Sequence, residues 1–390
     1  MDETKKGNEI DGNDANLVKN RSEILFVYDI TNANPNGDPV MNRPRMDEDT
    51  EINLVSDTRL KRTVRDYLGM RLGEDKIFVK ASDNENGKRK TKEQSLKEFL
   101  ATQNDSGLTS KKSEQMLEHQ YIDLRLFGAT LPVPKSDGDK KKRSSGRSKV
   151  DDNKTDANVD GASATDVKEG TASEDLKTLK WIGPVQFRFG HSLHKVLPMV
   201  LKGTSVFPSK EGQEMGTFTE FNYVPYSLIA FSGIVNEENA KATGLTEGDV
   251  NWLDDALWNG TKGLITRSKY GQMPRFLMQV IYRDGMHFHI GDLDNAIGLL
   301  LPDGKVLDTA DINGRLLRKV SEFMIDLTNV VKVLRLNSDR IKEIRIRSDS
   351  TATFAIRKEA NVDKIGGTDL TNRFKQEIQE ITITELSDLK

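Results

Sequence analysis

The sequence contains no cysteine among its 390 residues. Disulfide bonds, zinc sites built on thiolates and cysteine nucleophiles are therefore excluded. It also lacks an apolar run long enough to cross a bilayer. Its first twenty residues are polar and acidic, unlike a signal peptide. We therefore expect a cytoplasmic protein with no membrane partner.

Hydrophobic residues are also scarce, at 35%, whereas charged residues make up 31%. This balance indicates large solvated segments. Residues 1–21 are expected to form a disordered tail, and residues 135–178, rich in Ser, Gly, Asp and Lys, a flexible loop. The net charge of −3 does not by itself indicate nucleic-acid binding. The basic residues cluster locally, however, and such clusters can form a basic surface on a nearly neutral protein.

Hydrophobic periodicity predicts alternating strands and helices between residues 24 and 283. Strand patterns cover 24–31, the alternating Val185, Phe187 and Phe189, part of 222–235, and 276–283. Helices are predicted from Ser56 to the glycines at 69 and 73, and after a capping box at Thr246 and Asp249. A further helix near 315–334 and a strand near 343–348 are expected.

With its insertions removed, this order is βαββαβ. We therefore predict an α+β fold with the ferredoxin-like arrangement of RNA-recognition (RRM-like) domains. Residues 203–221, which carry several glycines and a proline between strand-like flanks, are expected to form a protruding hairpin.

The stretch DITNANPNGDP, residues 29–39, leaves the first strand for turn formers and amide side chains, and NRPR follows at 42–45. Asn tolerates unusual backbone angles and donates to phosphates or base edges, and closely spaced guanidiniums suit backbone phosphates. The alternative is a structural turn with ordinary surface arginines. The RNA-binding candidates in this loop are Asn34, Asn36, Arg43 and Arg45.

The first helix carries several basic residues opposed only by Asp57 and Asp66, which favours an external anion. A solvated helix face is the alternative. The candidates on this helix and its N-cap are Ser56, Arg59, Lys61, Arg62 and Arg65.

The segment TRSKYGQMPR, residues 266–275, combines basic, hydroxyl and aromatic groups before a predicted strand. Such a mixture suits a single-stranded nucleic acid, although a helix–strand connection with solvated cations explains it equally well. The candidates here are Arg267, Ser268, Lys269, Gln272 and Arg275.

Two other features are better explained without a ligand. The basic run KKKRSSGRSK at 140–149 lies in the predicted flexible loop, where such runs are usually solvated. His287 and His289 would share a strand face in MHFHI, but a zinc site needs further ligands, so structural histidines are the better interpretation. We expect no metal, no cofactor and no catalytic residue.

Taken together, DITNANPNGDP, NRPR, LVSDTRLKRTVRDYL, DLRLFGA and TGLTEGDVNWLDDALWNGT with TRSKYGQMPR resemble a known family. They resemble the backbone subunit of type I CRISPR Cascade complexes, in the Csh-type (subtype I-B) branch of the Cas-seven family of RAMP proteins. The resemblance covers roughly residues 22–350.

The resemblance implies a hand-like architecture. An RRM-like palm would comprise 22–71, 181–202 and 222–350, with fingers at 72–180, a thumb at 203–221 and a C-terminal extension at 351–390. Met215, at a glycine-flanked tip, would be the wedge by which the thumb kinks RNA.

It also implies a non-catalytic function in antiviral defence. Copies of the chain would stack in a helical oligomer along one crRNA, with other Cascade subunits, and present the guide for pairing with target DNA. Such contacts are largely sequence-independent, because base pairing reads the sequence.

Two alternatives remain open. One is a metal-dependent ribonuclease of the RAMP type that uses Asp38. The other is a scaffold whose basic loops bind acidic protein partners.

Overall fold

The structure is a computed structural model and describes residues 16–84, 87–102, 110–132, 178–204, 218–358 and 361–389. The predicted α+β class is confirmed, because helices and mixed sheets alternate along the chain. The chain divides into two compact units. Unit 1 contains residues 1–80, 117–128 and 182–390, and unit 2 contains residues 81–116 and 129–181. The loop predicted at 135–178 lies almost entirely outside the described residues.

A ten-stranded sheet forms the centre of unit 1. Eight strands run in order across it: β17 (Thr382–Glu385), β14 (Ile341–Ser348), β10 (Met273–Tyr282), β1 (Ser22–Ala33), β9 (Phe218–Val235), β7 (Gly190–Lys195), β3 (Ile52–Val55) and β2 (Met46–Asp47). The two remaining strands, β6 (Val185–Phe187) and β8 (Met199–Thr204), pair with different parts of β9.

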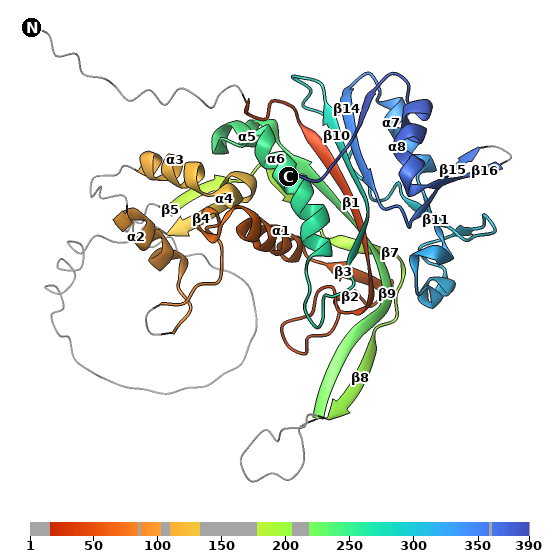
Figure 1. Cartoon of the computed structure of the whole chain (residues 1–390), viewed down its shortest axis with the longest axis horizontal. Helices are drawn as coiled ribbons and strands as arrows, with labels where there is room; N and C mark the ends of the chain where they lie inside the picture. The colour runs from red at the N-terminus through yellow and green to blue at the C-terminus, as the bar shows by residue number, and fades with distance from the viewer. Residues whose placement is uncertain are drawn as a thin grey trace, which may run out of the picture. The chain divides into compact units, whose positions relative to one another are not determined.

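The strand β1 is buried on both faces, which explains why its sequence reads as a continuous apolar run. Leu25 and Val27 face one hydrophobic cluster, and Ile24 and Phe26 face the other. Helices α1 (Asp57–Leu72) and α6 (Glu247–Asp255) pack into the second cluster, and α7 (Thr328–Leu336) and α8 (Leu370–Glu377) into the first. The two pairs of helices therefore cover opposite faces of the sheet (Figure 1).

The first helix forms for the local reasons that the sequence predicts. The Ser56 side chain caps its N-terminus by accepting a hydrogen bond from the Arg59 backbone, and Gly73 ends it at φ 108°. Farther along, α6 begins with the predicted capping box of Thr246 and Asp249 and runs into a π-helical turn, η3 (Ala256–Gly260). Shorter helices α4 (Ile122–Phe127), α5 (Glu237–Thr243) and η2 (Glu74–Lys76) complete this face.

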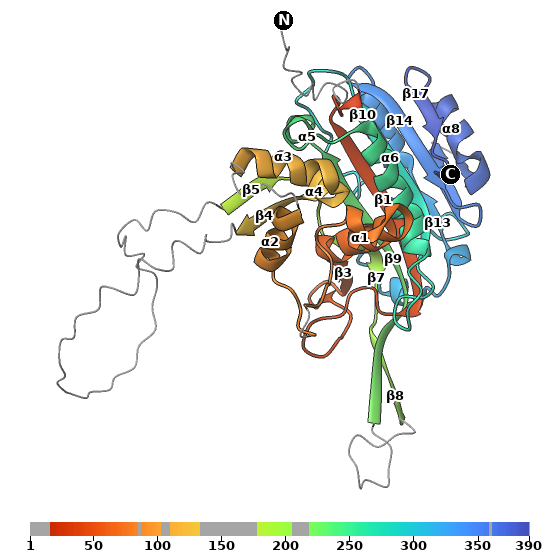
Figure 2. The same ribbon diagram turned by 60° about the vertical axis from the view of Figure 1, so that its left-hand side comes forward.

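The hairpin of β8 and β9 extends beyond the rest of unit 1 (Figures 1 and 2). Its paired part runs from Met199 opposite Tyr223 to Thr204 opposite Phe218. The predicted hairpin at 203–221 thus begins earlier along the chain than expected. Residues 205–217, including Met215, lie outside the described residues.

A second sheet of unit 1 was not predicted. Its order is β12 (Val306–Leu307), β11 (Gly298–Leu300), β13 (Met324–Asp326), β15 (Thr353–Lys358) and β16 (Asn361–Gly366). The helix predicted near 315–334 is confirmed only in its last part, as α7. The rest of the segment contains the short 3₁₀ turns η4 (Ile312–Leu316) and η5 (Val320–Glu322), then β13. The stretch MHFHI is not a strand, since residues 286–290 have no regular structure.

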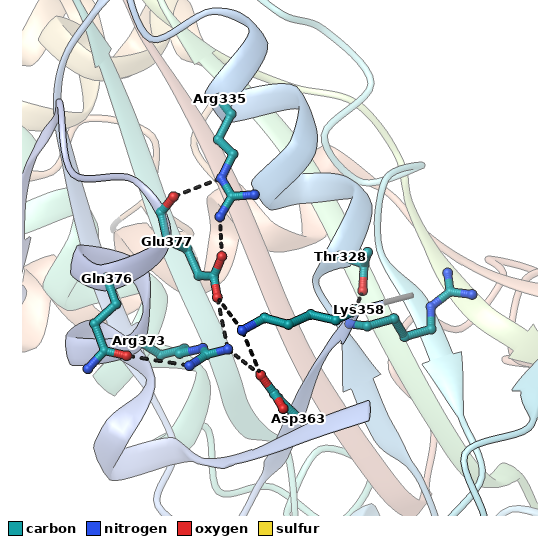
Figure 3. A network of polar contacts seen from close by, with 8 residues as sticks. Thr328, Arg335, Lys358, Asp363, Arg373, Gln376 and Glu377 are labelled. Atoms are coloured by element: carbon teal, nitrogen blue, oxygen red, sulfur yellow. Dashed lines mark hydrogen bonds and ion pairs between the residues drawn. The ribbon is translucent and has the colours of Figure 1, made fainter. Parts of the chain in front are cut away.

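The C-terminal residues belong to the fold rather than extending from it. β15 pairs in parallel with β13, and β17 pairs in parallel with β14, so segment 351–390 completes both sheets. A polar network then ties α7 and α8 to the β15–β16 hairpin (Figure 3). Glu377 accepts from Arg373 at 2.8 Å and also pairs with Arg335, while Lys358 reaches Asp363 at 3.2 Å. The turn η6 (Gly367–Asp369) precedes α8.

The predicted tail at 1–21 is wrong for its last residues. Val18 is buried, and its backbone N–H donates to the Leu245 carbonyl at 3.0 Å. Unit 2 contains α2 (Lys92–Thr102), most of α3 (Ser110–Gln120), and the two-stranded sheet of β4 (Gly128–Pro132) and β5 (Thr178–Ile182). No helix of the described residues combines the length and apolar character that a membrane crossing requires.

Candidate nucleic-acid interface

The loop of residues 34–45, between β1 and β2, is shaped by Asp38. One carboxylate oxygen accepts from the backbone N–H groups of Val40 and Met41, at 2.7 and 2.8 Å, and the other from that of Arg43 at 2.7 Å. These hydrogen bonds, that of Met41 foremost, lower the pKa of Asp38. A Cβ at Gly37 would lie 1.9 Å from Asn42 Oδ1, so a larger residue there would displace the Asn42 side chain. Asp38 therefore organises the loop.

The two asparagines predicted to contact RNA are buried within this loop. Asn36 Oδ1 accepts from both the backbone N–H and the hydroxyl of Ser56, each at 2.9 Å, and so fixes the loop to the start of α1. Asn34 Nδ2 donates to the Asn42 carbonyl at 2.7 Å. Both side chains hold the loop in shape, and so does Ser56, whose hydroxyl also caps α1.

The two arginines of the loop have the opposite environment. Arg43 and Arg45 are exposed on either side of the buried Pro44. Neither guanidinium forms an ion pair with another residue that the structure describes. A loop whose backbone is fixed by hydrogen bonds, and whose exposed guanidiniums form no ion pair, is suited to binding an external anion.

Three of the cations of α1 are paired within the protein. Lys61 contacts Asp57 at 3.1 Å, and the exposed Arg62 pairs with Asp66 at 2.6 Å. Arg65 pairs at 3.0 Å with Asp123, whose side chain is fully buried. The guanidinium of Arg65 also lies 4.9 Å from the centroid of the Phe127 ring. The predicted excess of free charge on this helix is therefore wrong for these three residues.

Arg59 and Lys269 are two further cations that form no ion pair with a described residue. Arg59 donates to the Thr63 hydroxyl at 3.0 Å, and the Lys269 ammonium donates to the Asn34 carbonyl. Burial, and then the charge of Arg59, lower the pKa of Lys269 to about 8, and burial lowers the pKa of Arg59. Within the described residues neither of them forms an ion pair, although the charge of Asp66 partly offsets the effect of burial on the pKa of Arg59. Two adjoining, half-buried cations with so little counter-charge would be stabilised by an anion.

The loop 264–272 lies against the first loop, since Asn34 N–H donates to the Ser268 carbonyl at 2.9 Å. Arg267 is exposed, with its guanidinium 5.6 Å from the centroid of the Phe221 ring on β9. Gln272 is buried and donates to the Lys269 carbonyl at 3.3 Å.

The prediction that Arg275 lies in this loop is wrong. β10 begins at Met273, and Arg275 is buried within it, where its guanidinium pairs with Asp29 at 2.9 Å and with Asp349. Because its charge is compensated inside the protein, Arg275 does not form part of the exposed surface.

A groove of about 810 Å³ runs beside the first loop. Its lining includes Arg43, Arg45, Phe189 and the start of β8, together with the acids Asp38, Asp47, Glu48 and Glu51. Asn222 of β9 donates to the Met41 carbonyl at 3.1 Å, which joins the hairpin to the loop. Of the acids that line the groove, Glu51 is paired with Lys195 at 3.3 Å and with Arg315. Phe189 was assigned to a half-buried strand from its sequence, so its place in this groove was missed.

The other chemical candidates do not assemble into a site. In the described part of the chain, no group of three or more His, Asp or Glu side chains could hold a metal ion. His287 Nδ1 lies 3.4 Å from a carboxylate oxygen of Glu237. Asp38, the candidate for a ribonuclease, uses both carboxylate oxygens to hold backbone amides.

Residues 20–299 match the family of CRISPR-associated protein Cas7. The chain is 32% identical over 337 residues to the CRISPR-associated protein Cas7 of Haloferax volcanii, a match that covers 85% of this chain and 87% of that protein.

Solved structures give weaker likenesses. A chain of a "CRISPR RNA-guided surveillance complex, pre-nicking" has a TM-score of 0.44 at 14% identity, over 85% of this chain and 93% of that one. A chain of another "CRISPR RNA-guided surveillance complex" has a TM-score of 0.41 at 12% identity, over 87% and 95%. The assignment rests on the sequence matches, by which this chain belongs to the Cas7 family.

Proposed function

We propose that this chain is a crRNA-binding backbone subunit of a type I Cascade complex. Copies of it would assemble along one guide RNA, together with other Cascade subunits, and present the guide for pairing with target DNA in antiviral defence. The observation that carries the proposal is a set of cations that form no ion pair with the described residues, in a chain of the Cas7 family. Arg43 and Arg45 line the groove, and Arg59, Arg267 and Lys269 lie on the adjoining helix and loop.

The palm, fingers and thumb belong to the same proposal. The order β10-β1-β9-β7, antiparallel throughout, with α1 and α6 on one face, supports an RRM-like palm. Unit 2 supports a fingers insertion within 72–180. The β8–β9 hairpin supports the thumb, whose proposed wedge residue is Met215.

The surface recognises the RNA backbone in this proposal. Guanidinium and ammonium groups contact phosphates whatever the sequence, and releasing counterions makes such binding salt-dependent. A nuclease role for Asp38 is not proposed, because its carboxylate is engaged with the loop backbone. The scaffold alternative requires the same cations to bind an acidic protein and not free RNA.

The test compares single-stranded RNA binding by the full chain and by two variants at several salt concentrations. We expect the double variant Arg43→Ala, Arg45→Ala to bind at least tenfold more weakly. Its slope of log affinity against log salt should fall by about 1.4, which is about 0.7 for each lost phosphate contact.

The matched control is Arg62→Ala, which removes an exposed arginine that already pairs with Asp66. It should bind RNA nearly as well as the unaltered chain. Equal losses of RNA affinity in the two variants would show that RNA is bound by the surface charge in general and not by the groove. Failure of the unaltered chain to bind RNA, together with binding to an acidic protein, would favour the scaffold.

A further inference from the structure

Phe189 is exposed where the sequence pattern places a core residue. Val185 and Phe187 on β6 are buried, with exposed fractions of 0% and 8%, and strict alternation would bury Phe189 beside them. Instead, 62% of its side-chain surface is exposed. An exposed aromatic ring at this position loses the hydrophobic stabilisation that burial in the strand register would provide.

A β-bulge causes this change of direction. Phe187 pairs with Gly233 and His191 with Ala230, so four steps along one strand oppose three along β9. The extra residue falls at 188–190, where β6 has ended and β7 begins. Bulges of this kind turn a side chain away from its expected face and are frequent beside functional sites.

The space that Phe189 would fill inside the protein is already occupied. Gly190 lies directly against the ring of Phe231, and a Cβ at Gly190 would come within 2.3 Å of that ring. Phe231 is fully buried. The Phe189 side chain is therefore kept at the surface by the bulge, by Gly190 and by the buried ring of Phe231.

The exposed ring stands between two hollows. It lines the groove that carries Arg43 and Arg45, and it also lines a hollow of about 570 Å³ beside Arg188 and Asp294. In the second hollow the charges are compensated, since Arg188 pairs with Asp292 at 2.7 Å and contacts Asp294 at 2.5 Å. Free cations are therefore found only on the first side of the ring, among the residues that the structure describes.

We propose that Phe189 is a stacking platform for a base of the bound single-stranded RNA, beside phosphates held by Arg43 and Arg45. An aromatic face next to unpaired cations is how single strands are bound without sequence preference, because every base offers a π-face. This inference rests on the proposed function and adds a base-binding residue to it. A protein partner is the less favoured occupant, since it would have to place carboxylates opposite both adjacent guanidiniums, whereas a nucleic-acid strand carries a phosphate at every nucleotide.

The experiment uses the full chain and RNA oligonucleotides that carry one 2-aminopurine at successive positions. We expect the fluorescence of the analogue at particular positions to change on binding. With Phe189→Ala this change should disappear and the affinity should fall about tenfold, the loss expected for one stacked base. The salt dependence should not change, because no phosphate contact is removed.

Two variants separate the ring from its apolar surface. Phe189→Tyr should restore both affinity and fluorescence change, whereas Phe189→Leu should restore neither fully. Leu336→Ala is the matched control, since Leu336 is a 73% exposed apolar residue at the end of α7. Circular dichroism of each variant confirms that the fold is retained.

The outcomes distinguish this inference from the proposed function. If the unaltered chain binds RNA and Phe189→Ala changes neither affinity nor fluorescence, the stacking platform is overturned while the RNA-binding function stands. If Phe189→Ala instead disrupts self-association of the RNA-free protein, the ring serves contact between copies and the inference is equally overturned. Failure of the unaltered chain to bind RNA would overturn both.

Discussion

Arg275 and Asp29 form a buried ion pair, with the arginine Nε 2.9 Å from the aspartate Oδ2. The Tyr226 hydroxyl donates to the same oxygen at 2.8 Å. The pair joins β10 to β1 close to where the loop 264–272 ends and a few residues before the loop 34–45 begins. It therefore supports the base of both loops without being exposed to a ligand.

Replacing Arg275 with alanine should destabilise the protein. Asp29 would remain as a buried, uncompensated carboxylate, which typically costs about 3–5 kcal/mol. Urea unfolding of the unaltered chain and of Arg275→Ala measures the difference. Arg267→Ala is the control, because the exposed Arg267 has no carboxylate partner among the described residues, and its loss should leave stability within about 0.5 kcal/mol. Equal stabilities of the two variants would contradict the structural role of Arg275.

RNA affinity should depend on pH through Lys269. Its pKa of about 8 means that the ammonium is mostly charged near pH 7 and mostly neutral near pH 9. Because the charged form binds a phosphate, affinity should fall several-fold across that range, and bound RNA should raise the pKa. Fluorescence anisotropy of labelled RNA at a series of pH values measures this fall.

Lys269→Arg should remove most of the pH dependence, because a guanidinium keeps its charge throughout this range. Lys61→Arg is the matched control, since Lys61 is already paired with Asp57. That variant should keep the profile of the unaltered chain. A profile unaffected by Lys269→Arg would show that another group controls the pH dependence.

Asp38→Ala should weaken RNA binding without altering any RNA cleavage. The variant loses the acceptors for three backbone N–H groups, so the loop that carries Arg43 and Arg45 should become less ordered. Incubation of end-labelled RNA with magnesium, analysed on denaturing and native gels, separates the two roles. RNA that is cut by the unaltered chain and left whole by Asp38→Ala would support the ribonuclease instead.

Local features of this fold could be predicted from the sequence. The start of α1 at Ser56 and its end at Gly73 depend on capping groups within a few residues, and the capping box of α6 is equally local. The strand β1 was recognised from its apolar run. The two loops that carry the free cations were identified because turn formers and basic residues are adjacent in the chain.

Features that depend on distant partners could not be predicted. Arg275 was assigned to a binding loop because Asp29, its partner, is 246 residues away. The sequence predicts that Asn36 contacts RNA, whereas its side chain bonds to Ser56, twenty residues along the chain. Phe189 obeys the strand alternation in sequence, and only the register of β9 reveals the bulge that exposes it.

The second sheet was missed for a related reason. Its strands are short, and its β13–β15 pairing is parallel, so the two hairpins of the sheet are joined through strands that are not neighbours in the chain. The same holds for β17, which pairs in parallel with β14. A prediction based on local periodicity misses these pairings and therefore assigns residues 351–390 to a C-terminal extension.

Asp254 leads to a prediction of how the stability of the folded protein depends on pH. It is buried, and neither carboxylate oxygen has a hydrogen-bond partner among the described residues. Burial chiefly, together with Glu247 and Asp255 and against the opposing charge of Arg345, raises its pKa from 3.8 to about 7. Between these values the unfolded chain has released the proton that the folded chain still holds, so the stability contributed by this group falls as pH rises.

Asp254→Asn should therefore be more stable than the unaltered chain, by an amount that grows between about pH 4 and about pH 7 and then levels off. The pKa difference sets a ceiling of about 4 kcal/mol on the gain. Urea unfolding at several pH values measures it. Asp255→Asn is the control: Asp255 accepts from the Tyr67 hydroxyl and from Asn259, each at 2.7 Å, so its amide variant should lose stability at every pH. If Asp254→Asn instead lost stability above pH 7, the ionised carboxylate would have to be stabilised in the folded protein, because a buried charge without partners cannot favour folding.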